Sequence, residues 1–184
     1  MKGYHYIKRG IDIILSGMAI VILSPLLLFL CIAIKLDTPG PILFKQKRVG
    51  IHRSFFQIYK FRTMRIDTPK DVPTHMLENP EQYITKVGKF LRKTSLDELP
   101  QIFNIFKGEM SIVGPRPALW NQDDLVAERE KYGANDVTPG LTGWAQINGR
   151  DELEIPDKAR LDGEYVKHLG PWMDPNSPKN SEKH

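Results

Sequence analysis

The stretch Ser95-Leu96-Asp97-Glu98-Leu99-Pro100-Gln101 predicts the start of a helix with two neighbouring carboxylates in its first turn. Ser95 and Glu98 have the spacing of a capping box, in which each side chain satisfies a free backbone N–H of the other residue. A helix N-terminus favours negative charge, so helix capping alone would account for Asp97 and Glu98. From Leu99 onward, apolar residues recur at intervals of three and four, which predicts one apolar helix face. These residues are Leu99, Ile102, Phe103 and Phe106.

Basic residues on both sides of this stretch suggest a second role for the two carboxylates. Arg92 lies shortly before them, and Gly114-Pro115-Arg116-Pro117 follows the predicted helix. A helix N-terminus with carboxylates and nearby cations can hold a metal-bound phosphate and attack it. The prolines on either side of Arg116 fix the local backbone and favour a two-point contact with phosphate. An exposed arginine in a structural turn is the alternative. We therefore take Asp97 and Glu98 as the candidate catalytic pair.

Composition limits the class of protein. The chain has 184 residues, enough for one globular domain and an appendage. Its net charge of +4 and isoelectric point near 9.1 favour anionic partners such as phospholipid, sugar nucleotide or nucleic acid. The single cysteine, Cys31, permits no disulfide within the chain and no cluster of cysteine and histidine metal ligands around it. The reducing cytoplasmic face of a membrane is the simplest assignment.

Residues 13–34 carry no charged side chain and are long enough to cross a bilayer as a helix. Ser24-Pro25 lies near the middle of this run. Pro25 cannot donate to the carbonyl of Val21, which the Ser24 hydroxyl can bind instead. Basic residues flank both ends of the run, and such residues mark the cytoplasmic side of short flanks. We therefore predict a re-entrant helix over residues 1–36, broken at Ser24 and Pro25. A kinked spanning helix is one alternative, and a cleavable signal peptide, which lacks a small-residue cleavage site here, is the other.

Residues 42–49 and 55–64 predict two strands joined by a turn. In the second strand Phe61 alternates with Lys60 and Arg62, so both cations point to one side. This face is either a solvated strand surface or a cationic wall for phosphate or lipid headgroups.

The rest of the chain predicts short elements around glycine- and proline-rich turns. Residues 138–150 contain several glycines and a proline, so their backbone shape matters. Within this segment Trp144 and Arg150 could cover or bind a ligand, although a tryptophan is more commonly buried in the core. Residues 174–184 are polar, and we expect them to be disordered. The remaining expected elements are a basic amphipathic helix at 84–93, a strand at 110–113 and helices at 121–132 and 157–169.

Taken together, these segments resemble one protein family, the small monotopic phosphoglycosyl transferases. These bacterial sugar transferases begin glycoconjugate assembly on a polyprenol phosphate. The order and spacing of the matching segments cover most of the chain, from Ile7 to Tyr165. The segments are Ser24-Pro25, Lys60-Phe61-Arg62-Thr63-Met64, Ser95–Gln101, Lys107-Gly108-Glu109-Met110-Ser111, Gly114–Pro117, and Pro139-Gly140-Leu141-Thr142-Gly143-Trp144 running to Gly149-Arg150.

The resemblance implies an α+β, mostly helical fold. Its parts are a re-entrant membrane helix over residues 1–36, a small cytosolic catalytic domain with a short β-hairpin over residues 37–173, and a polar tail over residues 174–184. It also implies that Asp97 attacks the β-phosphate of a UDP-sugar and that Mg²⁺ binds at Asp97 and Glu98. A phosphosugar-aspartyl intermediate would then pass its phosphosugar to polyprenol phosphate.

The partners that the resemblance implies are a UDP-sugar, undecaprenyl phosphate and membrane phospholipid, with no nucleic acid, and the released product is UMP. It places the protein at the cytoplasmic face of the bacterial inner membrane. The reaction would be the first membrane step in the assembly of a polysaccharide, a glycoprotein glycan or an O-antigen. The candidate phosphate-binding residues are Arg116, Arg92, Lys60, Arg62 and Arg150.

Two other functions fit parts of the sequence. A membrane-anchored adaptor would use the basic residues to bind anionic lipid or nucleic acid, but this leaves the carboxylates and glycine-rich turns unexplained. A metal-dependent phosphodiester hydrolase would use the same carboxylates with water as the acceptor. Release of UMP, measured with and without polyprenol phosphate, distinguishes the three functions.

Overall fold

A long N-terminal helix, α1 (Lys2–Asp37), dominates the computed structural model, which describes residues 2–68, 79–149 and 153–169. Within these residues the fold is α+β and mostly helical, as predicted, with two small two-stranded sheets. Arg150 and the predicted tail at 174–184 lie outside the described residues.

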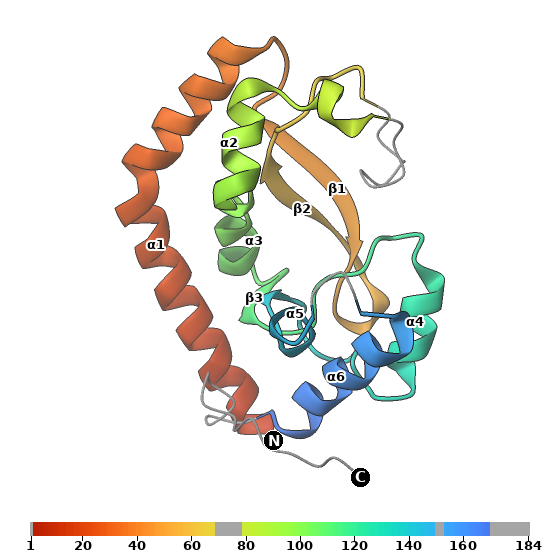
Figure 1. The fold of residues 1–184 in the computed structure, drawn as a ribbon. Coiled ribbons are helices and arrows are strands. Elements are labelled where there is room, and N and C mark those ends of the chain that lie inside the picture. Colours follow the sequence, from red (N-terminus) through yellow and green to blue (C-terminus); the bar gives the residue numbers. More distant parts are fainter. Residues whose placement is uncertain (1, 69–78, 150–152, 170–184) are drawn as a thin grey trace.

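The elements after α1 are short, and most of the predicted ones are present with ends shifted by a few residues. In chain order they are β1 (Leu43–Val49), η1 (Ile51–Arg53), β2 (Phe55–Phe61), η3 (Pro80–Tyr83), α2 (Lys86–Thr94), η4 (Leu96–Glu98), α3 (Gln101–Lys107), β3 (Ser111–Val113), α4 (Asp123–Glu130), β4 (Gly140–Thr142), α5 (Trp144–Ile147) and α6 (Ile155–Lys167). The helices α2 and α3 lie between α1 and the hairpin β1–β2 (Figure 1).

The helix α1 continues through Pro25 without a non-helical segment. The carbonyl of Val21, which Pro25 cannot serve, accepts a hydrogen bond of 2.8 Å from the Ser24 hydroxyl, as the sequence predicts. The break that the sequence predicts at Ser24 and Pro25 is therefore not observed, and Pro25 lies within one continuous helix. By length and composition alone, α1 is apolar enough to cross a membrane. One of its faces exposes large apolar side chains at seven-residue spacing, namely Ile14, Val21 and Leu28.

The hairpin has the predicted strands and turn. The strands β1 and β2 pair antiparallel, and β2 ends at Phe61, short of the predicted Met64. The free edge of β2 is satisfied by a buried side chain of α3, Asn104. Its Oδ1 accepts a 3.0 Å hydrogen bond from the backbone N–H of Tyr59, and its Nδ2 donates one of 2.8 Å to the carbonyl of Gln57. This contact holds α3, and the turn η4 before it, beside the next residue of β2, Lys60.

The main hydrophobic core joins α1 to the hairpin and to the helices α2 and α3. Its buried members are Leu27, Leu30, Ile34, Phe61, Leu91 and Ile102. Burial of a side chain of this size contributes about 1.5–3 kcal/mol relative to exposure. The C-terminal half of α1 is therefore part of the domain's own core, while its opposite face stays exposed and apolar.

Candidate active site

The two carboxylates of the opening stretch lie in a single 3₁₀ turn, η4, and not in the first turn of α3. Ser95 has a left-handed backbone (φ 57°) because it also ends α2, and its side chain makes no capping hydrogen bond. The predicted capping box between Ser95 and Glu98 is therefore wrong. α3 begins only at Gln101, so both carboxylates precede it, and the Glu98 side chain projects toward Lys60 of the hairpin.

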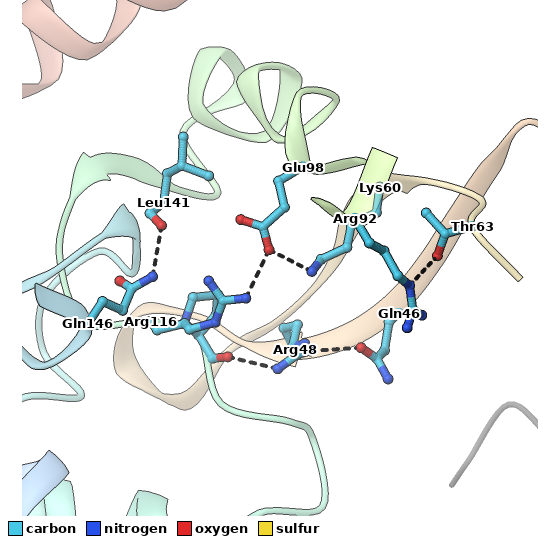
Figure 2. Close-up of polar contacts among 10 residues, drawn as sticks. Gln46, Arg48, Lys60, Thr63, Arg92, Glu98, Arg116, Leu141 and Gln146 are labelled. Atoms are coloured by element: carbon cyan, nitrogen blue, oxygen red, sulfur yellow. Dashed lines mark hydrogen bonds and ion pairs between the residues drawn. The ribbon is translucent and has the colours of Figure 1, made fainter. Parts of the chain in front are cut away.

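Glu98 is bound between two basic side chains from different parts of the chain. Its Oε1 accepts hydrogen bonds of 2.8 Å from Nζ of Lys60 on β2 and 2.9 Å from Nη2 of Arg116 (Figure 2). Burial by itself raises the pKa of Glu98, but the charges and hydrogen bonds of Lys60 and Arg116 outweigh burial and lower this pKa to about 2. Glu98 is therefore ionised throughout the physiological range.

Asp97 has the opposite electrostatic environment. Burial raises the pKa of Asp97 above its usual value, and the neighbouring charge of Glu98 raises it too. Lys60 and Arg92 oppose this rise without cancelling it. A carboxylate with a raised pKa is more basic and so a better nucleophile, and perturbed pKa values of this kind concentrate at functional sites.

Arg116 is held by a loop whose backbone is fixed by tight packing against the glycine-rich segment. The N–H of Gly114 donates to the carbonyl of Thr142 at 2.8 Å, and the N–H of Gly140 donates to the carbonyl of Pro115 at 2.9 Å. At Gly143, a Cβ atom would collide with the backbone carbonyl of Gly114. This close approach explains why the segment needs glycine there, a role that the sequence indicated only as a requirement on backbone shape.

A buried ion pair supports the same loop from the far side. Arg129 on α4 donates to Oδ2 of Asp162 on α6 at 2.6 Å from Nη2, and to the carbonyl of Arg116 at 3.0 Å from the same atom. Both members of the pair are almost fully buried. Arg129 lies in the helix expected at 121–132, but no sequence pattern indicated its role in this ion pair.

Of the other predicted cations, Arg92 is near the carboxylates and Arg62 is not. Arg92 donates from Nε to the Thr63 hydroxyl at 2.9 Å, and its charge acts on Asp97. Arg62 is buried and donates to the carbonyls of Pro39 and Thr38, at 2.9 and 2.8 Å. This side chain therefore anchors the connection between α1 and β1, and its binding of phosphate stays a prediction.

The carboxylate pair fits a magnesium site by the chemistry of its donors. Among the described residues no group of three or more His, Cys, Asp or Glu side chains could hold a metal ion. Mg²⁺, however, is usually bound through one or two carboxylates together with water and substrate phosphate oxygens. Asp97 and Glu98 supply such a pair of hard oxygen ligands.

The described residues thus combine an exposed apolar helix, α1, with a carboxylate pair that is surrounded by Lys60, Arg92 and Arg116. The chain belongs to the bacterial sugar transferase family, whose model matches residues 3–177.

Several relatives match almost the whole chain. It is 41% identical over 181 residues to a UDP-glucose:undecaprenyl-phosphate glucose-1-phosphate transferase of Escherichia coli, covering 91% of this chain and 38% of that protein. It is 39% identical over 177 residues to a UDP-N-acetylgalactosamine-undecaprenyl-phosphate N-acetylgalactosaminephosphotransferase of Aeromonas hydrophila, covering 93% and 41%. An uncharacterized sugar transferase of Bacillus subtilis is 39% identical over 168 residues, covering 91% and 81%. The chain therefore spans about two fifths of the first two relatives and about four fifths of the third.

Proposed function

We propose that this protein transfers a phosphosugar from a UDP-sugar to a polyprenol phosphate such as undecaprenyl phosphate, and releases UMP. The observation that carries the proposal is the pairing of an ionised Glu98, bound by Lys60 and Arg116, with a neighbouring Asp97 whose pKa is raised. The names of the E. coli and A. hydrophila relatives, which include undecaprenyl phosphate and a UDP-sugar, support the choice of substrates.

In the proposed reaction Asp97 is the nucleophile. A bond forms between its carboxylate oxygen and the β-phosphorus of the donor, and the bond from that phosphorus to the bridging oxygen breaks, so that UMP leaves with the bonding electrons. A phosphate oxygen of the polyprenol phosphate then attacks the same phosphorus and releases Asp97. Two displacements let one site serve a soluble donor and a lipid acceptor in turn.

The basic side chains reduce the repulsion between Asp97 and the negatively charged diphosphate. Arg92 lies near Asp97, and Arg116 offers a planar guanidinium suited to phosphate oxygens. Glu98 orients Lys60 and Arg116 before the substrate binds. Asp97 and Glu98 would hold Mg²⁺, which supplies further positive charge to the diphosphate when it is bound.

We further propose that α1 enters and leaves the membrane from the cytoplasmic face and rests among the phospholipids of one leaflet. Contacts at both ends of α1 support this topology. Near its N-terminus, Arg9 donates to the carbonyls of Ile105 and Phe106 on α3, at 2.6 and 2.7 Å. Near its C-terminus, Ile34 packs in the core with Leu91. Because both ends of α1 contact the same domain, these contacts favour a topology in which both ends face one side of the membrane.

Quantifying UMP after mixing the full chain with a UDP-sugar and Mg²⁺ tests the reaction. Without acceptor, we expect a burst of about one UMP per active site and a phosphosugar adduct on Asp97 detectable by mass spectrometry. Adding polyprenol phosphate should release the adduct and start steady turnover. Steady UMP release without acceptor would instead indicate a hydrolase, and no release would indicate an adaptor.

The variant Asp97→Asn separates catalysis from folding. It keeps the shape of the side chain and removes the attacking anion, so both the burst and turnover should fall by several orders of magnitude while the thermal unfolding midpoint stays near that of the wild type. Asp124→Asn, at an exposed acid on α4, is the matched control and should retain the full burst. Turnover that persists in Asp97→Asn would show that Asp97 has only a structural role in the turn η4.

A further inference from the structure

Arg48, on β1, is a partly buried cation with no assigned role in the candidate site. Its Nη2 donates to Oε1 of Gln46 at 2.8 Å, and its Nη1 donates to the carbonyl of Pro117 at 3.1 Å (Figure 2). Both acceptors are neutral. Its Nε is buried and has no hydrogen-bond partner among the described residues. Within the described part of the chain, Arg48 therefore has no carboxylate bound to it.

A cation buried in this way is costly unless an anion accompanies it. Burial lowers the pKa of Arg48 to about 10, the nearby charge of Arg116 lowers it too, and only Glu98 acts in the other direction. Glu98, however, already neutralises Lys60 and Arg116 through direct hydrogen bonds. The positive charge of Arg48 is thus left without a counter-charge, beside a second guanidinium that repels it.

The hairpin places Arg48 on the same strand face as Lys60, the partner of Glu98. Because side chains alternate along a strand, Gln46 and Arg48 on β1 share a face, and the cross-strand pair Phe44–Lys60 puts Lys60 on that face as well. Figure 2 shows Arg48 between Gln46 and the Arg116 loop, on the same side of the hairpin as Glu98. Gln46 and the carbonyl of Pro117 each occupy one terminal nitrogen, which holds the guanidinium plane in place.

We propose that Arg48 is a further substrate-binding residue that, together with Arg116, binds a phosphate group. The ligand is a phosphate-class anion, supplied either by the diphosphate of the nucleotide donor or by the phosphate of the lipid acceptor. The choice between the donor and the acceptor as the source of this phosphate rests on the proposed function, whereas anion binding at Arg48 does not. The buried Nε and the repulsion between Arg48 and Arg116 are features that a bound phosphate would relieve.

Thermal unfolding of the detergent-solubilised full chain with and without inorganic pyrophosphate tests anion binding without any turnover. Pyrophosphate should raise the unfolding midpoint of the wild type. Because a ligand that binds only the folded state stabilises it, the shift should fall to roughly a third or less in Arg48→Met. Arg53→Met is the matched control, since Arg53 lies at the tip of the same hairpin and pairs with Glu130 at the surface. It should keep the full shift.

Arg48→Lys preserves the charge and guards against a variant that does not fold. A lysine cannot make the two-point contact, so its pyrophosphate shift should lie between those of the wild type and Arg48→Met. No shift in the wild type, or equal shifts in all variants, would overturn the assignment. The UMP burst of the wild type is measured separately. A failed burst counts against the proposed function, whereas the pyrophosphate shift alone tests whether Arg48 binds an anion.

Steady-state kinetics then distinguish the two sources of phosphate. If Arg48 binds the donor, Arg48→Lys should raise the KM for the UDP-sugar by about tenfold and leave that for polyprenol phosphate nearly unchanged. If Arg48 binds the acceptor, the pattern should be reversed. Unchanged KM values for both substrates would contradict a substrate-binding role.

Discussion

Asp12 of the apolar helix α1 accepts a hydrogen bond of 2.7 Å from the hydroxyl of Ser111, the first residue of β3. Its second carboxylate oxygen accepts a bond of 3.0 Å from the N–H of Ile112. Asp12 and Ser111 are 5% and 1% exposed, so the contact is closed to water. Since β3 leads directly into the loop that carries Arg116, one buried carboxylate links the proposed membrane helix to the proposed phosphate-binding loop.

Removing this carboxylate should destabilise the protein strongly. Asp12→Ala deletes two charge-assisted hydrogen bonds and leaves Ser111 and Ile112 with unpaired donors, a loss of about 3 kcal/mol in the free energy of unfolding. Ser111→Ala should cost less, and the double variant should show a coupling energy of about 1–2 kcal/mol. Denaturant unfolding of the three variants in detergent measures these values. Purely additive effects would mean that the two side chains do not support each other.

Arg116→Lys should lose more activity than its conserved charge suggests. Nη2 of Arg116 donates to Glu98, and the planar guanidinium has further N–H groups that can bind phosphate at two points. A lysine has no such planar set of donors. We expect kcat/KM for the UDP-sugar to fall by about ten- to a hundredfold with little change in the unfolding midpoint. Wild-type kinetics in this variant would show that Arg116 serves only as a partner of Glu98.

Glu98→Gln should remove an acid-sensitive part of the protein's stability. The pKa of Glu98 is lowered to about 2, so its ionised form stabilises the folded state fully above its usual value near 4.5. This contribution is lost as pH falls from about 5 toward 2, because folded and unfolded states then bind the same proton. The difference in unfolding free energy between wild type and variant should reach roughly 2–3 kcal/mol at pH 6 and shrink on acidification. A difference that does not change with pH would contradict this account.

The topology of α1 can be tested with single cysteines at its two ends. Lys2→Cys and Thr38→Cys, each in a Cys31→Ser background, should both resist an impermeant thiol reagent added outside intact cells. Both should react once the cells are lysed. Labelling of one end alone in intact cells would identify a spanning helix and overturn the re-entrant proposal. Pro25→Ala, which restores a hydrogen-bond donor in the middle of α1, should shift the population toward that spanning form.

Local sequence patterns were sufficient for most of the secondary structure. The composition of residues 42–49 and 55–64 and the turn between them predicted the hairpin, and the positions of Ser24 and Pro25 predicted a hydroxyl bound to the carbonyl of Val21. These features depend on residues a few positions apart, whose geometry is set by the backbone itself. The strand β3 was expected at 110–113, but its parallel pairing with β4 was not foreseen, because β4 has only three residues and is too short to show any period.

Local patterns were less reliable where a residue serves two elements. The capping box was predicted from the spacing of Ser95 and Glu98, yet Ser95 ends α2 in a left-handed conformation and its hydroxyl does not cap. Arg62 was expected to share a strand face with Lys60, but β2 ends at Phe61, and the guanidinium of Arg62 donates to carbonyls in the connection from α1. In each case a neighbouring segment offered the residue a stronger interaction than the local pattern did.

The sequence by itself thus determined the apolar helix with its central proline, the hairpin, and the candidate pair Asp97 and Glu98 with basic residues nearby. Only the tertiary structure decided which cations bind Glu98, why Arg48 lacks a counter-charge, and that Asp12 joins α1 to β3. The physical reason is that burial and charge pairing depend on segments far apart in the chain. Asp12 and the N–H of Ile112 are separated by 100 positions, and no periodicity within either segment records their contact.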